Sequence, residues 1–529
     1  MKVLTALLVL LLAAASTHSQ TADATHARTA QEKDFRVKGF HLDMRIQVMK
    51  MPALKALATE LRKKGINTLL VEWEASYPFR DEPIIANRYA YSRSELSAFT
   101  HYCASIGLDV IPLQQSFGHV EYILRHARYA QLREDDRDFS QVCPAQTDLN
   151  RQLFTTLYKD LISTHSSPYI HIGCDETHLL GHCPRCQKLA AEEGLSKVYF
   201  NHVKMLCDIV IGLGKIPVLW ADIALKYPDF IKLLPKQTVL VDWNYGWAID
   251  RFGSHTALAT SGYEVWGAPA LRSDPDNYYL TRWQYHFNNI SAFIPQCAEF
   301  GYKGVIMTSW STSGEYDAVF DGGNELKDLY AVRHVYPLTG FNILIDAFIE
   351  ALARPGSFDS DKFITAWSRR QYGLNETSAG LFKTALFTTP YKVLDGNVLS
   401  QSPMSLAALL DSARVASAIL DSLHPMRNQA EFDHYRLMAK IRVYYLSYRN
   451  IEAQVNAASN PDDLKKYVAR LKALMATEPA LAQSFQRLNN KTLYPSAIEE
   501  ENAIRIYKIH ALYQRLIRQT SSSPSLPSS

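Results

Sequence analysis

Two adjacent carboxylates, Asp175 and Glu176, follow a short apolar run at residues 169–174. A run of this length and composition predicts a buried strand over 169–175. Because side chains alternate between the two faces of a strand, neighbouring acids reach one site only if the strand stops between them. We therefore predict that Asp175 ends the strand, that Gly173 loosens the backbone, and that Glu176 opens the next loop. Such a pair suits acid and base chemistry on an uncharged substrate; the alternative is a solvated acidic loop.

The elements that must position this pair form a repeating pattern of strands and helices. Helices are predicted at 52–64, from a capping box at Ser92 and Glu95 to Gly107, from about 121, at 184–212 and up to about Gly301. Continuously apolar strands, typical of parallel strands buried on both faces, are predicted at 35–44, 67–74, 109–115, 169–175, 216–222, 238–244, 263–269 and 304–310. The pattern indicates a (β/α)₈ TIM barrel over residues 36–345. A doubly wound open sheet is the alternative, but no glycine-rich phosphate loop follows the first strand.

The pattern changes after the barrel. Apolar residues recur at three-and-four spacing in the segments 406–423, 431–456, 461–476 and 497–518, which predicts a C-terminal α-helical domain over 346–520. The aromatic stripe of the second segment is interpreted as core packing. The Ser- and Pro-rich end at 521–529 is predicted to be a disordered tail.

Composition and the N-terminus limit the classes of function. The chain has 529 residues and a formal net charge of +3, which gives no reason to expect nucleic acid as a partner. Residues 1–19 have the pattern of a signal peptide, followed by a linker over 20–35, so we expect an exported protein, periplasmic or extracellular. The apolar run of the signal is too short for a membrane span, and no later segment is long and apolar enough.

The spacing of Cys183 and Cys186 is the one suggestive cysteine pattern among seven cysteines. A lone pair of this kind is weak evidence for zinc, which needs two more ligands, although His178 and His182 lie close in sequence. In an exported protein, a local disulfide or two unpaired thiols fits better.

Function in a barrel gathers at the carboxyl ends of the strands. Four tryptophans are predicted there together with acids, one histidine and one arginine: Asp43, Arg45, Glu72, Glu74, Gln115, His119, Trp220, Asp222, Trp243, Tyr245, Trp266 and Trp310. Indole faces stack on the C–H faces of a sugar ring, and charged groups bond its hydroxyls, so this set favours a carbohydrate. Each residue also has a plain structural interpretation, as core packing, an ion pair or a loop cap. Neither a serine nucleophile elbow nor a phosphate-binding loop of the Walker type is present.

These motifs, taken together, resemble a known family. The segments GFHLDMR, LLVEWEASYPF, VIPLQQSFGHVEY, HIGCDETHLLG, VLWAD, VDWNY and GVIMTSW are similar in order and spacing to those of glycoside hydrolase family 20, the β-N-acetylhexosaminidases, and of its hexosaminidase D branch. The resemblance covers about residues 36–320. It implies removal of terminal N-acetylglucosamine or N-acetylgalactosamine from glycans by a retaining, substrate-assisted reaction through an oxazolinium intermediate. It implies neither a cofactor nor a catalytic metal.

The resemblance also implies roles for individual residues. Glu176 is expected to be the general acid and base, and Asp175 to orient the substrate's 2-acetamido group. Tyr245 is expected to bond the acetamido oxygen, within indole walls formed by Trp220, Trp243 and Trp310. His119 would support the acids, while Arg45 and Asp222 would bind substrate; Glu315 is only a loose counterpart of the family's glutamate after Trp310.

Two other functions are compatible with parts of this sequence. One is a non-catalytic carbohydrate-binding barrel. The other is a metal-dependent barrel hydrolase built on His171, Asp175, Glu176 and His178, which lacks ligands from other strands.

Overall fold

Side chains that alternate along eight strands build the centre of the molecule. The computed structural model describes residues 35–246, 251–273, 276, 281–311, 316–317, 330–331, 335–388, 392–394, 397–399, 404–458 and 463–521. The predicted signal peptide at 1–19, almost all of the linker at 20–35, Glu315 and all but the first residue of the predicted tail lie outside these ranges.

Eight parallel strands close into a barrel within the described part of the chain. They are β1 (Val37–Asp43), β2 (Thr68–Glu72), β3 (Asp109–Leu113), β4 (Tyr169–His171), β5 (Ile216–Trp220), β6 (Val239–Trp243), β7 (Glu264–Ala268) and β9 (Gly304–Ser309). Each pairs with the next in sequence order, and β1 pairs with β9 to close the ring. A short extra strand, β8 (Ala270–Arg272), continues beyond β7 and pairs with β9. The predicted TIM barrel is confirmed.

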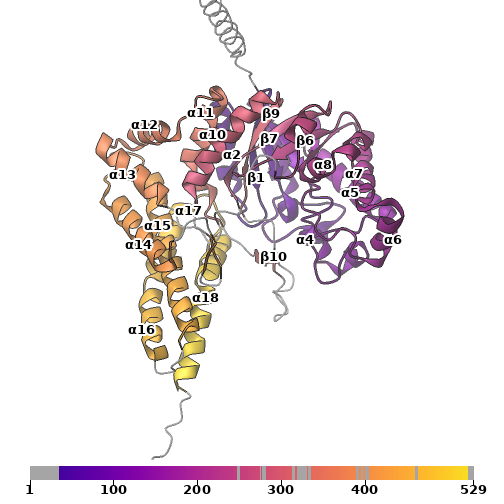
Figure 1. Ribbon diagram of the computed structural model, residues 1–529. Coiled ribbons are helices and arrows are strands. Elements are labelled where there is room, and N and C mark those ends of the chain that lie inside the picture. Colours follow the sequence, from indigo (N-terminus) through magenta and orange to yellow (C-terminus); the bar gives the residue numbers. More distant parts are fainter. Residues whose placement is uncertain are drawn as a thin grey trace, which may run out of the picture.

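Helices cover the outside of the barrel (Figure 1). They are α2 (Met51–Lys63), α3 (Arg93–Ser105), α4 (Glu121–Leu124), α5 (Thr147–Ile162), α6 (Pro184–Glu193), α7 (Leu195–Gly212), α8 (Asp222–Lys226), α9 (His255–Ala259), α10 (Trp283–Glu299) and α11 (Asn342–Ala353). The capping box of α3 is present, because Ser92 and Glu95 bond each other's backbone N–H. The single helix predicted at 184–212 is wrong: Gly194, at φ +86°, separates α6 from α7.

Two apolar cores result from the alternation along the strands. In β1, Phe40 and Leu42 pack outward against the helices, whereas Val37 joins the barrel interior. The interior is filled by the inward residues of the other strands, among them Leu70, Ile111, Leu113, Val218, Val239, Val241 and Ile306. At the carboxyl ends this inward series ends in polar or aromatic side chains, so the filled core stops below the catalytic face expected of such a barrel.

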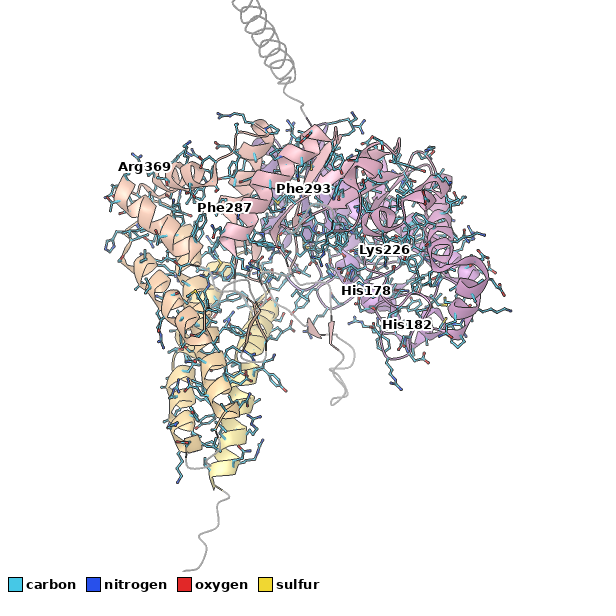
Figure 2. All side chains as sticks on the ribbon, in the orientation of Figure 1. His178, His182, Lys226, Phe287, Phe293 and Arg369 are labelled. Carbon is cyan, nitrogen blue, oxygen red and sulfur yellow. The ribbon has the colours of Figure 1, made fainter. Side chains whose placement is uncertain are left out.

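A helical region follows the barrel, shown in orange to yellow in Figure 1. It comprises α12 (Ser360–Tyr372), α13 (Glu376–Phe387), α14 (Leu406–Ser422), α15 (Gln429–Asn456), α16 (Leu464–Met475), α17 (Glu478–Asn489) and α18 (Pro495–Ser521). Phe287 of α10, labelled in Figure 2, contacts Phe363 and Phe387, so the outer barrel core continues into this region. None of the described helices has the length and apolar character to cross a membrane.

Candidate active site

The carboxyl ends of the strands bring the predicted site residues together. Inward positions of β1 and β2 end in Asp43 and Glu72, and β5 and β6 end in Trp220 and Trp243. Because parallel strands end at the same rim, these side chains share one face of the barrel. In Figure 1 this rim faces downward, and in Figure 2 His178, from the loop after β4, lies on the same side.

The loop after β4 places both acids at the site in a way that differs from the prediction. The predicted strand 169–175 is too long: β4 ends at His171. Three of the next five residues, Gly173, Cys174 and Glu176, have positive φ of 71°, 76° and 46°. This irregular backbone breaks the two-residue alternation of a strand, so that adjacent acids can face one site. Non-glycine residues rarely adopt such φ values, and they cluster at functional sites.

His119 contacts both acids. Its Nε2 lies 3.4 Å from Asp175 Oδ2 and 3.3 Å from Glu176 Oε2. The preceding Gly118 allows the approach, since a Cβ there would lie 2.5 Å from the carbonyl oxygen of Asp175. Burial disfavours the imidazolium, but the two carboxylates outweigh it and hold the pKa of His119 well above its ordinary value. A charged histidine therefore ties the two acids together.

The two acids differ in exposure. The Asp175 side chain is 9% exposed and that of Glu176 is 38% exposed. Oδ1 of Asp175 is buried and has no hydrogen-bond partner among the described residues. A buried carboxylate oxygen without a donor is costly, so this atom is suited to a donor that a ligand supplies.

Asp222, at the start of α8, links the acids to the aromatic wall. Its Oδ2 accepts a hydrogen bond from the backbone N–H of Glu176 at 3.2 Å, and its Oδ1 lies 3.4 Å from the indole nitrogen of Trp243. Burial, together with the charge of Asp175, raises the pKa of Asp222 to about 7. Asp222 therefore holds its proton up to about neutral pH.

Aromatic rings form the opposite side of the site. The indole N–H of Trp310 donates to the Tyr245 hydroxyl at 2.9 Å, and the ring of Tyr245 lies 5.0 Å from that of Trp243. Trp220 lies 6.0 Å from Trp310, and its buried indole N–H has no hydrogen-bond partner among the described residues. The three predicted indoles and the predicted tyrosine thus form one wall.

Arg45 is buried among acids beside this wall. Its Nε lies 3.2 Å from Asp43 and 3.8 Å from Glu74, and its guanidinium carbon lies 5.0 Å from the centre of the Trp310 ring. Burial disfavours the charged form of Glu72, but Arg45 and His41 outweigh this effect and lower the pKa of Glu72 to about 2. Burial raises the pKa of Glu74 well above its usual value. All nine predicted site residues are therefore joined by contacts into one constellation.

Two members of the site were not predicted from the sequence, and one residue was predicted at the wrong end of its strand. His41 contacts Glu72 at 3.3 Å and lies 4.4 Å from the Trp310 ring; its position two residues before Asp43 was the available signal. Burial raises the pKa of Glu121, which is close to His119, to about 7. Trp266 is not at the carboxyl end: it pairs with Gly304, the first residue of β9, and contacts Tyr169, the first of β4.

The predicted metal-hydrolase ligands do not converge. His119, Asp175 and Glu176 lie close enough to share a cation, but His171 and His178 are not part of that group. Burial lowers the pKa of His171 to about 3. His178 and His182 are exposed side chains in Figure 2, and neither lies with Cys183 and Cys186, whose neighbours are Glu134 and Cys143.

The sequence of this chain is similar to those of known proteins. Residues 41–328 match the family model of the glycosyl hydrolase family 20 catalytic domain. Hexosaminidase D of Bos taurus is 26% identical over 290 residues, which cover 51% of this chain and 83% of that protein. Hexosaminidase D of Homo sapiens is 25% identical over 303 residues, covering 54% of this chain and 62% of that protein.

Among solved structures, a β-N-acetylhexosaminidase from Bacteroides fragilis is 18% identical, with a TM-score of 0.48, over 64% of this chain and 70% of that one. The family model covers more than half of the chain, from β1 past β9. All nine predicted site residues lie within the matched residues 41–328. The chain therefore belongs to glycosyl hydrolase family 20.

Proposed function

We propose that this protein is an exo-acting β-N-acetylhexosaminidase that removes terminal N-acetylglucosamine or N-acetylgalactosamine with retention of configuration. Family membership supports the reaction class. The observation that carries the proposal is the buried Oδ1 of Asp175, which has no donor among the described residues and lies beside an aromatic wall. The amide N–H of a 2-acetamido group is a donor of the required kind, and its methyl group suits indole faces.

The difference in exposure between Asp175 and Glu176 supports a different role for each acid. Asp175 is enclosed and suits a group that stays with the sugar, whereas the half-exposed Glu176 suits the leaving oxygen and then water. In the proposed reaction, the acetamido oxygen attacks the anomeric carbon while the bond to the aglycone oxygen breaks. Glu176 gives its proton to that oxygen, and Asp175 stabilises the positive charge of the oxazolinium ring. Glu176 then takes a proton from the water that opens the ring.

The electrostatics of the site are consistent with a proton on this group of acids. Asp175 and Asp222 lie close to Glu176, and repulsion between carboxylates favours a shared proton. His119 Nε2 lies 3.4 Å from Asp175 and 3.3 Å from Glu176, so a charged histidine offsets part of that repulsion. A charged Asp175 is what the oxazolinium ring requires.

A panel of aryl β-glycosides that differ only at C2 and C4 tests the proposal. We expect turnover of the 2-acetamido sugars and negligible turnover of plain β-glucosides and β-galactosides, even at saturation, because the nucleophile is missing. A thiazoline mimic of the intermediate should inhibit far more tightly than the free sugar. Efficient turnover of a plain glucoside, or trapping of a sugar on a carboxylate by a 2-fluoro glycoside, would refute substrate assistance.

The variant Asp175→Asn tests the proposed role of Asp175. It should lower turnover and weaken binding of the thiazoline together, because the positive ring loses its partner charge. Asp208→Asn, at an exposed ion pair with Lys204 on α7, is the control and should change neither. If Asp175→Asn bound the mimic as tightly as the parent, the assigned role would be wrong. A complete absence of turnover on the panel would instead favour the carbohydrate-binding alternative.

The same proposal includes export, on the strength of the sequence of residues 1–19. N-terminal sequencing of the protein secreted by its own host, or recovered from its periplasm, should begin near residue 20. Recovery of the full-length chain in the cytoplasm would contradict this.

A further inference from the structure

A second cluster of reactive side chains lies outside the active site. The Sγ atom of Cys143 is 3.4 Å from that of Cys183 and 3.5 Å from that of Cys186, and Glu134 Oε2 accepts from the Cys186 thiol at 3.1 Å. The four ligand atoms all lie within 4.8 Å of one another. They come from segments about 40 residues apart, so the fold itself has assembled them.

The dimensions of the cluster fit a tetrahedral ion better than a disulfide. Zinc binds thiolate sulfur at about 2.3 Å, which places tetrahedral sulfurs about 3.8 Å apart. A disulfide would single out one pair of sulfurs at about 2.0 Å. Cys143 instead lies almost equally far from both partners. The observed spacing is close to that of a shared ion.

The buried carboxylate of Glu134 also suits a bound cation. Glu134 is only 2% exposed. Its carboxylate forms no ion pair with any lysine, arginine or histidine that the structure describes. Its hydrogen-bond partners are the backbone N–H of Cys183, at 2.9 Å, and the Cys186 thiol. A buried carboxylate with only neutral donors is costly, and a divalent cation would remove that cost.

The surroundings resemble those that support thiolate ligands. The backbone N–H of Cys186 donates to Cys183 Sγ at 3.3 Å, at the N-terminus of the ten-residue helix α6. The guanidinium of Arg185 lies 3.9 Å from Cys143 Sγ. Both features place hydrogen-bond donors on sulfur atoms of the cluster, as outer partners of metal-binding thiolates do.

We propose that Glu134, Cys143, Cys183 and Cys186 bind one Zn²⁺ ion in a closed, structural site. Three thiolates and one carboxylate complete a tetrahedral set, so no position is left for a substrate or a catalytic water. The inference is independent of the proposed glycosidase reaction.

The position of the site explains what such an ion would do. The segment 133–143 contacts the loop of His119, since Val142 N–H donates to the carbonyl of Phe117 at 3.0 Å. It also contacts the loop of Glu176, where Leu179 N–H donates to the Gln141 side chain at 3.0 Å. An ion joining Glu134 and Cys143 to Cys183 and Cys186 would hold the two active-site loops against each other.

Metal analysis of the full-length protein tests the proposal. Protein produced with zinc, purified with a reductant and dialysed against metal-free buffer should retain about one zinc per chain. Cys143→Ser and Cys186→Ser should reduce this to background, and Glu134→Gln should weaken zinc binding by about tenfold or more. The matched controls Cys103→Ser and Cys207→Ser replace buried cysteines remote from the cluster and should keep the metal.

A second measurement does not depend on whether the variants fold. The parent protein stripped of zinc and loaded with Co²⁺ should show the intense absorption of a tetrahedral cobalt site and a sulfur-to-cobalt charge-transfer band. Parent protein that takes up neither zinc nor cobalt would overturn the proposal. So would peptide mapping that finds Cys143 joined by a disulfide to Cys183 or Cys186 in protein that was produced with zinc but holds no metal. Turnover of glycosides is not used in either measurement, so failure of the glycosidase proposal would leave this test intact.

Discussion

Asp175 and Glu176 are neighbours in sequence but have opposite environments. One carboxylate is enclosed and the other is more than a third exposed. Because burial and access decide what a carboxyl group can do, the environments separate a charge-stabilising role from a proton-transfer role. This separation depends on the positive φ of Glu176, which turns its side chain out of the direction a strand would give it.

Glu176→Gln should fold normally and lose about 10²- to 10⁴-fold in turnover of substrates with poor leaving groups. The loss should be smaller for aryl glycosides with good leaving groups, because these need less protonation. Steady-state kinetics on both substrate types measures the difference. Glu192→Gln, an exposed position on α6, is the control. Equal losses on both substrate types would show that Glu176 is not the acid.

Asp222 should make stability depend on pH. Its pKa is about 7 in the folded protein and about 3.9 in an unfolded chain, so the folded state binds the proton more tightly. The resulting stability is present below about pH 4 and is lost as the pH rises towards 7. The loss is on the order of 3 kcal/mol.

Denaturant unfolding of the parent and of Asp222→Asn between pH 4 and pH 7.5 measures this dependence. The parent should lose stability relative to the variant as the pH rises, since the variant cannot lose a proton at this position. A pH-independent difference between the two would contradict the assignment.

The positions of these residues could largely be predicted at this scale because the residues end apolar strands or lie in the loops that follow them. All nine predicted residues are in contact in one constellation, from His119 to Arg45. Trp266 could not be distinguished from the tryptophans of the site, because the sequence around a tryptophan inside the barrel does not show at which end of the strand it lies. The partners of Cys183 and Cys186 could not be found either, because Cys143 and Glu134 are brought to them only by the fold.

The connection after β4 is the element that most determines the geometry of the site. Gly173 has φ +71°, and a Cβ there would lie 1.9 Å from Gln115 Oε1. The amide nitrogen of Gln115 in turn donates to Glu72 at 2.9 Å. A side chain at 173 would therefore displace a hydrogen bond of the Arg45 and Glu72 cluster.

Gly173→Ala should destabilise the protein more than Gly214→Ala. Gly214 has φ +76° but open space around its Cβ position, so alanine there costs about 1 kcal/mol for the left-handed backbone alone. The steric conflict at Gly173 should add about 2 kcal/mol. Denaturant unfolding measures both variants. Equal losses of stability in the two variants would mean that the loop after β4 adjusts to the added methyl group without strain.

Most strands could be predicted to within about two residues, because each is continuously apolar and buried on both faces. Helices were predicted less well where their burial is partial. The segment expected to contain a helix from about 121 holds only the short α4, and α5 was not anticipated. In α17 only Leu481 and Phe485 are buried apolar residues, so its periodicity is weak in sequence.

At the scale of the whole molecule, the C-terminal helices are packed against the barrel. The backbone N–H of Lys50 donates to the carbonyl of Thr492 at 2.7 Å, and Gln47 donates to Glu501 at 3.2 Å. On another side, Trp283 of α10 lies 5.5 Å from Tyr435 of α15. The predicted boundary at 345/346 falls inside α11, the helix that completes the barrel's outer layer. The division into domains stays a prediction.

Deletion of residues 356–529 should abolish cooperative folding of the barrel, because it would expose the apolar faces of α10 and α11 to water. Deletion of 521–529 is the control and should leave the melting temperature unchanged. Circular dichroism on heating, together with the soluble yield, compares the two proteins. A shortened chain that melts cooperatively at the parent's temperature would show that the barrel is independent.

The left-handed residues beside the active site limit how this protein can be made more heat-tolerant. Of the five described non-glycine residues with positive φ, four lie on the catalytic side of the barrel: Glu74, His119, Cys174 and Glu176. Glycine at any of them would relieve about 1 kcal/mol of backbone strain. A directed-evolution screen that selects survivors of heating alone would therefore favour glycine at Glu176, whose side chain is more than a third exposed, and would enrich stable proteins without turnover. Selection for industrial use has to score heat resistance and activity on the same clone.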